Sequence, residues 1–257
     1  MKQKHFLLLT IGLFMASSVF PHLSFAKKDP ELEKIKKVLE YKVHIKAENG
    51  EVFNAGQEAA MDPKTGRVYV LTNLVGVKQN REGGGIILDP KGFIAANFHT
   101  VSNAARITVT LHDHTELEAT IAQSYSDRDI AILRVKPPKP LKAIPFADSD
   151  SVKVGDQMYV IANSKQISNK IGGAQVTGLD QTKNENEKTK AITNIIQFVT
   201  DLPLQEGDSG SPILTKTGEF LGFIEAGHAL TQNPIYALPS NVIHNYYLKF
   251  LKTGKKN

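Results

Sequence analysis

From residue 43 onward, short runs rich in Val, Ile, Phe and Thr alternate with turn residues through most of the chain. Runs of this length and composition, bounded by Gly, Pro, Asn and Asp, are typical of β-strands. The pattern is interrupted by KPPKPLKAIP at residues 136–145, which holds four prolines. Because proline has no N–H to donate to a ladder, this stretch cannot lie inside a central strand. The sequence therefore predicts an all-β barrel or sandwich, with a proline-rich link between two lobes.

Two segments outside these runs have a helical pattern. In residues 29–40, four apolar residues fall close to one helical face: Leu32, Ile35, Val38 and Leu39. That face packs either on its own domain or against another subunit. Residues 241–252 predict a C-terminal helix. Between the strands, DPKG at residues 89–92 predicts a turn, and HDH at residues 112–114 predicts a hairpin tip.

The N-terminus has the layout of a secretory signal peptide. A basic start precedes an apolar run at residues 6–20, and Ser24-Phe25-Ala26 supplies the small residues of a cleavage site. The alternative is an uncleaved anchor, but the run is short for a span of about 20 residues. We therefore expect a signal peptide at residues 1–26, cleavage after Ala26, and a periplasmic or secreted protein without stable membrane insertion. A helical segment at residues 27–42 then precedes the main domain, residues 43–257.

Composition excludes several kinds of chemistry. The chain has no cysteine, so it has no thiolate nucleophile and no thiolate metal site. Its net charge is only +5, without a basic stripe interleaved with aromatic residues, so a nucleic-acid partner is not expected. His112 and His114 at one hairpin tip are a weak metal signal without a specified carboxylate partner. We predict no metal and no organic cofactor.

The strongest local signal is GDSGSP at residues 207–212. Glycines on both sides of Ser209 permit a tight backbone and leave space beside its hydroxyl. In such a turn the amides of Gly207 and Ser209, on either side of Asp208, can point into one hollow and form an oxyanion hole. The motif predicts Ser209 as a nucleophile and residues 207–209 as the oxyanion segment.

A serine nucleophile needs a base, and the base needs an orienting carboxylate. His99 follows the strand-like run FIAANF, and Asp129 precedes the run IAILRV, so both occupy strand ends where a side chain can face a cleft. The order along the chain is His, Asp, Ser, one of the known orders for this triad. We therefore predict His99, Asp129 and Ser209 as the catalytic residues.

Four stretches in this order resemble the HtrA/Deg branch of the trypsin-like serine proteases: GGGIILDPKGFIAANFHTV, SDRDIAILRV, FADSDSVKVGDQMYVIAN and FVTDLPLQEGDSGSPIL. The resemblance spans roughly residues 83 to 243. It implies two antiparallel six-stranded β-barrels of the chymotrypsin type, about 43–135 and 149–240, with short terminal helices. It also implies a serine endopeptidase acting on protein or peptide substrates, such as unfolded or damaged proteins, and a possible homotrimer.

The sequence also departs from that family. The family usually carries a PDZ domain after the peptidase, and we expect none here after the last motif. Asp208 stands where the family commonly has Asn, so we expect Asp208 to find a partner of its own. Ser211 replaces a usual glycine, and the GDSGSP form is also similar to that of bacterial glutamyl endopeptidases.

By resemblance, the substrate-binding residues are Leu202, Pro203, Leu204, Glu225, Ala226, Gly227 and Pro234. No Asp is expected at the pocket base, so the resemblance favours a small or medium apolar residue before the cleaved bond. Glu225 and His228 leave a polar or acidic preference open. Residues 225–227 are expected to pair with the substrate backbone as an added strand.

Two questions stay open at this point. The polar segment QTKNENEKTK at residues 181–190 is either an activation loop that leaves the enzyme latent or a plain flexible loop. The same fold could also serve as a binding module or chaperone with an idle triad.

Overall fold

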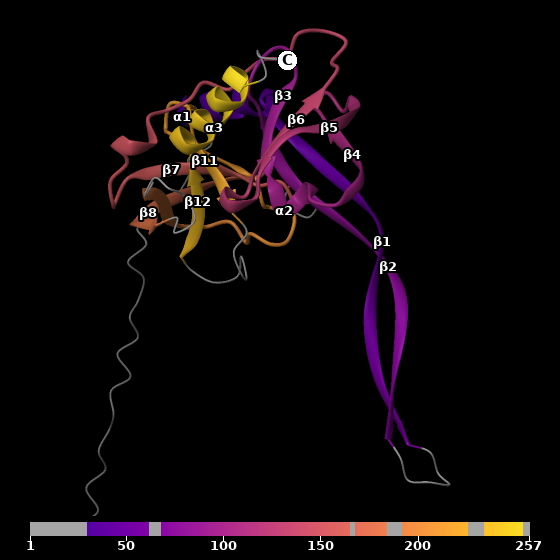
Figure 1. Ribbon diagram of the computed structural model, residues 1–257. Helices are drawn as coiled ribbons and strands as arrows, with labels where there is room; N and C mark the ends of the chain where they lie inside the picture. The colour runs from indigo at the N-terminus through magenta and orange to yellow at the C-terminus, as the bar shows by residue number, and fades with distance from the viewer. Residues whose placement is uncertain (1–29, 62–67, 165–167, 184–191, 226–233, 254–257) are drawn as a thin grey trace, which may run out of the picture.

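The structure is a computed structural model that describes residues 30–61, 68–164, 168–183, 192–225 and 234–253. In these residues the strands form two closed antiparallel barrels of six strands each, with short helices at both ends (Figure 1). The predicted all-β class and the two six-stranded barrels are confirmed. The predicted signal peptide at residues 1–26 lies outside the described residues.

The two barrels share one topology. The first runs in the order β1-β2-β3-β6-β5-β4, and the second in the equivalent order β7-β8-β9-β12-β11-β10. The strands of the first are β1 (Lys42–Met61), β2 (Val68–Ile87), β3 (Phe93–Asn97), β4 (Ala104–Thr110), β5 (Glu116–Tyr125) and β6 (Ile130–Val135). Those of the second are β7 (Gln157–Ile161), β8 (Ile171–Lys183), β9 (Ile192–Thr200), β10 (Pro212–Leu214), β11 (Phe220–Glu225) and β12 (Ile235–Pro239).

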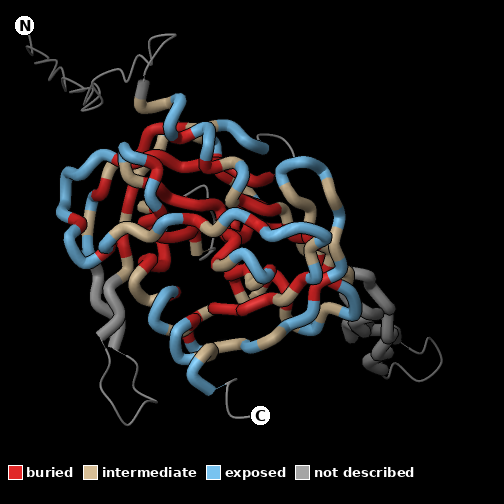
Figure 2. Tube along the Cα trace, turned by 90° about the horizontal axis from the view of Figure 1, so that it is seen from above, coloured by how far each residue is buried: buried red, intermediate tan, exposed pale blue. Residues whose placement is uncertain are grey.

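Three apolar clusters hold the molecule together. One fills the first barrel and includes Ile45 and Leu133, and a second fills the other barrel and includes Phe198. The third contains residues from both barrels, such as Ile132 and Phe223, and therefore packs the two barrels against each other. Figure 2 shows buried residues gathered in the interior and exposed ones on the outer turns.

Both terminal helices pack on this third cluster. Ile35 of α1 (Pro30–Lys36) and Val38 of the 3-10 helix η1 (Lys37–Glu40) are buried in it, so the apolar face of residues 29–40 packs on its own domain. Ile243 and Tyr247 of α3 (Ser240–Thr253) are buried in the same cluster. No helix in the described ranges is long and apolar enough to cross a membrane.

The connections follow the local sequence signals in part. The proline-rich residues 136–145 form no strand, and the turns at 89–92 and 112–114 join β2 to β3 and β4 to β5. The first three residues of the predicted polar loop at 181–190 belong to β8, which runs to Lys183. The rest of the predicted loop lies outside the described residues. The sequence analysis did not anticipate that β1 and β2 would continue beyond the barrel as a long two-stranded arm (Figure 1).

The barrels also meet through their main chains. The N–H of Gly84 on β2 donates to the carbonyl of Ser209 in the second barrel, with an N···O distance of 2.6 Å. A Cβ at Gly84 would lie 2.7 Å from the carbonyl oxygen of Gly210, and a Cβ at Gly83 would lie 3.1 Å from that of Ser209. Only glycine permits so close an approach of two backbones. The glycine run of β2 therefore sets the separation of the barrels beside Ser209.

This contact predicts that G84A destabilises the protein by about 1–3 kcal/mol, the usual cost of overpacking, because its methyl group meets a rigid carbonyl. Equilibrium urea unfolding measures the change. The matched control is G178A on β8, whose methyl group would meet the end of the flexible Gln197 side chain. The control should change stability by less than about 1 kcal/mol. Equal losses in the two variants would show that the close contact between Gly84 and Gly210 does not limit the stability.

Candidate active site

Strand pairing brings His99 and Asp129 together. β3 pairs with β6 in the register Asn97↔Ile130, so the residues after β3 lie beside those before β6. His99 lies in the short helix α2 (Phe98–Val101), and Asp129 directly precedes β6. The Nδ1 atom of His99 lies 2.7 Å from Oδ2 of Asp129. The predicted pair is thus a direct consequence of the barrel register.

The carboxylate of Asp129 is held on three sides. Its Oδ1 accepts a hydrogen bond from the backbone N–H of His99 at 2.7 Å, and its Oδ2 also accepts one from Asn97 Nδ2 at 2.9 Å. Asp129 has a left-handed backbone, with φ of 50°, which turns it out of the strand direction. A carboxylate so fixed makes Nδ1 of the imidazole the protonated nitrogen and leaves Nε2 able to accept a proton.

The helix that carries His99 is anchored from β2. The guanidinium of Arg81 donates to the carbonyl of His99, and to the hydroxyl and carbonyl of Ser102 at 2.9 and 3.2 Å. These bonds satisfy carbonyl groups at the end of α2, which a helix of this length cannot satisfy itself. The sequence analysis assigned no role to Arg81 or to Asn97, although both lie close to the His motif.

Ser209 lies in a tight turn built on two left-handed glycines. Gly207 has φ of 94° and Gly210 has φ of 77°. The N–H of Asp208 donates to the carbonyl of Gln205 at 3.0 Å, and that of Gly210 donates to the carbonyl of Ile224 on β11 at 2.9 Å. Ser209 is only 5% exposed. The turn is therefore closed on itself and fixed to a core strand.

The amides of Gly207 and Ser209 are the predicted oxyanion donors. Neither amide donates a hydrogen bond to any residue that the structure describes. The Ser209 hydroxyl likewise makes no hydrogen bond within the described residues, so the structure joins His99 to Asp129 but not to Ser209. The two halves of the site meet at Gly83, whose Cβ would lie 2.9 Å from the Thr100 side chain and 3.1 Å from the Ser209 carbonyl.

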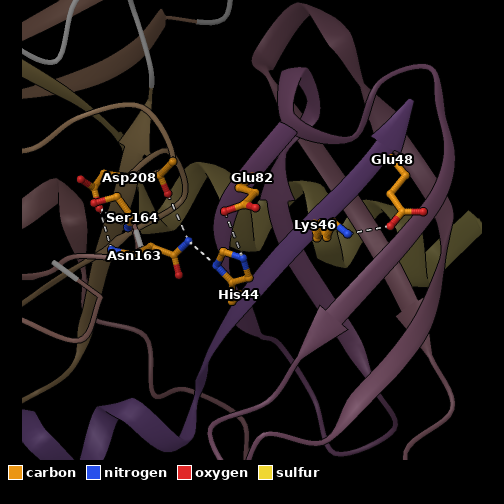
Figure 3. A network of polar contacts seen from close by, with 8 residues as sticks. His44, Lys46, Glu48, Glu82, Asn163, Ser164 and Asp208 are labelled. Atoms are coloured by element: carbon orange, nitrogen blue, oxygen red, sulfur yellow. Dashed lines mark hydrogen bonds and ion pairs between the residues drawn. The ribbon is translucent and has the colours of Figure 1, made fainter. Parts of the chain in front are cut away.

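Asp208 has hydrogen-bond partners in the loop that follows β7 and in the segment just before its own turn. Its fully buried carboxylate accepts hydrogen bonds from the backbone N–H groups of Asn163 and Ser164, both at 2.7 Å, and of Gln205 at 3.0 Å. Asn163 Nδ2 also donates to the carbonyl of Gly207 at 3.1 Å. Figure 3 shows Asn163 and Ser164 beside Asp208. The 163–164 segment therefore supports the Ser209 turn, a role that the sequence analysis did not assign to it.

The predicted substrate-binding residues occupy different environments. Leu204 is buried in the core of the second barrel, Leu202 is half-buried against that core, and Pro203 is exposed. Pro234 is half-buried, whereas Ala226 and Gly227 lie outside the described residues, as does His228.

Glu225, the last residue of β11, lies within the electrostatic field of the His99–Asp129 pair. Burial and the negative charge of Asp129 raise the pKa of Glu225, while His99 acts in the opposite direction. The side chain is therefore a third ionisable group at the site, in addition to its predicted place in the substrate-binding set.

A trypsin-like peptidase domain matches residues 83–223, which is more than half of the chain. The chain belongs to the trypsin-like peptidase family. The match includes the segments of His99, Asp129 and Ser209, and the resemblance noted in the sequence is confirmed.

Relatives of this trypsin-like peptidase are of the HtrA type. The periplasmic serine endoprotease DegP of Salmonella typhimurium is 32% identical over 177 residues, which are 67% of this chain and 36% of the relative. The probable periplasmic serine endoprotease DegP-like of Rickettsia conorii is 30% identical over 179 residues, 67% of this chain and 34% of the relative. The chain thus spans about a third of the length of these relatives.

A solved structure shares the fold of this peptidase. The HtrA-type protease AlgW, solved with a decapeptide, superposes with a TM-score of 0.68 at 18% sequence identity, covering 87% of this chain and 67% of that one. At this identity the likeness concerns the fold alone, and it agrees with the two-barrel topology.

The surroundings of Asp208 predict a graded response to substitution. D208N keeps one acceptor oxygen for Asn163 and Ser164 but turns an amide toward the N–H of Gln205, so we expect a loss of about 1–3 kcal/mol. D208A removes the acceptor of all three N–H groups and should cost more. Equilibrium urea unfolding of both variants measures the difference, and equal losses would show that the three hydrogen bonds do not govern the turn.

Proposed function

We propose that this chain is a serine endopeptidase that hydrolyses peptide bonds through an acyl-enzyme. The observation that carries the proposal is the His99–Asp129 hydrogen bond of 2.7 Å in a chain whose Ser209 turn adjoins the same glycine run. Family membership supports the reaction class. In this proposal Ser209 is the nucleophile, His99 the general base and acid, and Asp129 the group that orients the base.

The route of the Ser209 proton follows from the tautomer of His99. With Nδ1 of His99 donating to Asp129, Nε2 takes the Ser209 proton as the hydroxyl attacks the carbonyl carbon, and later gives it to the leaving amine. The Asp129 carboxylate stabilises the imidazolium formed between these steps. Water then reacts with the acyl-enzyme by the same route and restores Ser209.

The oxyanion of the tetrahedral intermediate would be bound by the amides of Gly207 and Ser209. Both N–H groups are without a partner among the described residues, and the turn that carries them is fixed by Asp208, Asn163 and Gly84. Donors held in place before charge develops need no reorganisation during the reaction, and losing one typically costs on the order of 10²- to 10³-fold in rate.

Substrate class and location belong to the same proposal. The solved HtrA-type neighbour was bound to a decapeptide, and the relatives are named periplasmic endoproteases. We propose an exported enzyme, with its signal peptide cleaved after Ala26, that cleaves unfolded or damaged proteins after a small or medium apolar residue. The substrate would pair as an added strand along residues 225–227. Assembly as a trimer is the form implied by the family resemblance.

A fluorophosphonate probe tests the nucleophile. S209A should abolish both labelling and peptide hydrolysis. The matched control is S211A, two residues along the same turn, because the buried Ser211 hydroxyl has no hydrogen-bond partner among the described residues. S211A should be labelled like the wild type. Labelling of S209A, or hydrolysis retained by it, would refute the assignment.

Glu225 predicts a shift in the pH profile. Removing its negative charge takes an anion away from the His99 imidazolium, so E225Q should move the acidic limb of kcat/KM to lower pH. A shift of roughly 0.5 pH unit is expected for a partly screened pair worth about 0.7 kcal/mol. E118Q, at an exposed position of β5, is the control. An unchanged acidic limb in E225Q would show that Glu225 is not charged beside His99 in the active enzyme.

A further inference from the structure

A small pocket lies between the two barrels, apart from the residues proposed for catalysis. It has a volume of about 110 Å³. One wall comes from β1 and the β4–β5 turn of the first barrel, and the other from the segment before β8 in the second. Its polar lining consists of Lys42, His44, Thr110, His112, His114, Ser168 and Asn169.

The base of the pocket holds a buried cation. Lys42 is only 5% exposed, and its ammonium donates to Oδ1 of Asn169 at 3.0 Å. No carboxylate of a described residue lies within ion-pairing distance of it. Burial lowers the pKa of Lys42 to about 8, although the charge of Asp208 acts in the opposite direction. An ammonium has three N–H donors, so Lys42 has donors left for a further acceptor. Its charge is buried without a counter-ion among the described residues, which is unfavourable.

Three imidazoles line the pocket as well. His44 pairs with Thr110 across β1 and β4, which brings it beside the turn that carries His112 and His114. Both turn histidines are exposed. An imidazole N–H can donate a hydrogen bond to an anion.

Each neighbouring acidic group already has a partner. The Glu82 carboxylate lies 3.6 Å from Nε2 of His44 in the pocket lining, and Glu40, which is near His112, pairs with Lys142. Asp113 accepts from the N–H of Thr115 and lies 3.8 Å from Lys139, while Asp208 is bound by three N–H groups. None of these carboxylates forms an ion pair with Lys42, so its ammonium is left to attract an anion. Figure 3 shows His44 between Glu82 and Asn163.

The chemistry of the lining favours an anion over a metal ion. An ammonium at the base repels a cation, and no group of three or more metal-ligating residues occurs in the described part of the chain. The pocket's volume is well above the ~10–15 Å³ that a cavity needs to hold one water molecule. The pocket therefore has room for a small polyatomic ion.

We propose that this pocket binds a tetrahedral oxyanion of the sulfate or phosphate type, with Lys42 as its central ligand. The side chains of Ser168 and Asn169 supply neutral hydrogen-bond donors, and the imidazole N–H groups of His112 and His114 supply further donors. The site is separate from the peptidase chemistry, so a failure of one proposal does not affect the other.

Isothermal titration calorimetry of the whole protein with sodium sulfate tests the site. Sulfate keeps a constant charge between pH 6 and 9, so any pH dependence belongs to the protein. At constant ionic strength in chloride, we expect one site that binds about tenfold more tightly at pH 6 than at pH 9, because the pKa of Lys42 is about 8. Phosphate at pH 6 should compete with sulfate, whereas acetate should not. Absence of sulfate binding at pH 6 would overturn the proposal.

Two variants locate the binding. K42M should weaken sulfate at least tenfold at pH 6, whereas K136M, at an exposed lysine outside the pocket, should bind like the wild type. The double variant H112Q/H114Q changes only exposed turn residues, and should weaken sulfate binding less than K42M does while keeping the unfolding midpoint. Equal affinity in the wild type, K42M and H112Q/H114Q would show that sulfate binds elsewhere and would refute the site.

Discussion

The main-chain contact between Gly83–Gly84 and Ser209–Gly210 is the constraint on which the rest of the active site depends. One barrel carries His99 and Asp129, and the other carries Ser209, so the residues of the proposed triad share no common strand. The hydrogen bond from Gly84 to Ser209 and the close approach to Gly210 fix the distance between the barrels next to these groups. The apolar cluster shared by both barrels and the terminal helices also holds this arrangement.

A second set of hydrogen bonds connects the Ser209 turn to the first barrel. Asp208 gathers three N–H groups under the Ser209 turn, and one amide group of Asn163 lies within hydrogen-bonding distance of both the Gly207 carbonyl and Nδ1 of His44. His44 in turn faces Glu82 on the glycine-bearing strand. The turn beside Ser209 is therefore specified by residues far from it in sequence.

Much of this could be predicted from the sequence. Alternating apolar runs and the proline-rich 136–145 segment indicated two β lobes, and the motifs around His99 and Asp129 indicated the pair that the β3–β6 register brings together. The arm of β1 and β2 was missed because strand length there follows from pairing between distant segments rather than from local pattern. Arg81, Asn97 and Asn163 were missed because a polar residue in or beside a strand has no signature of its own until its partner is known. The partner of Asp208 was expected but could not be named for the same reason.

The glycine seam also affects the entropy of substrate binding. Its contacts join main-chain atoms, so forming them restricts no side-chain rotamers, although glycine loses more backbone freedom on folding than any other residue. That loss occurs once, when the chain folds, and is not repeated when a peptide arrives. Ordering groups at the moment of association weakens binding. In the proposed peptidase, a contact of this kind leaves less conformational entropy to be lost in each encounter, so the free energy of peptide binding is available to align the bond that would be cut.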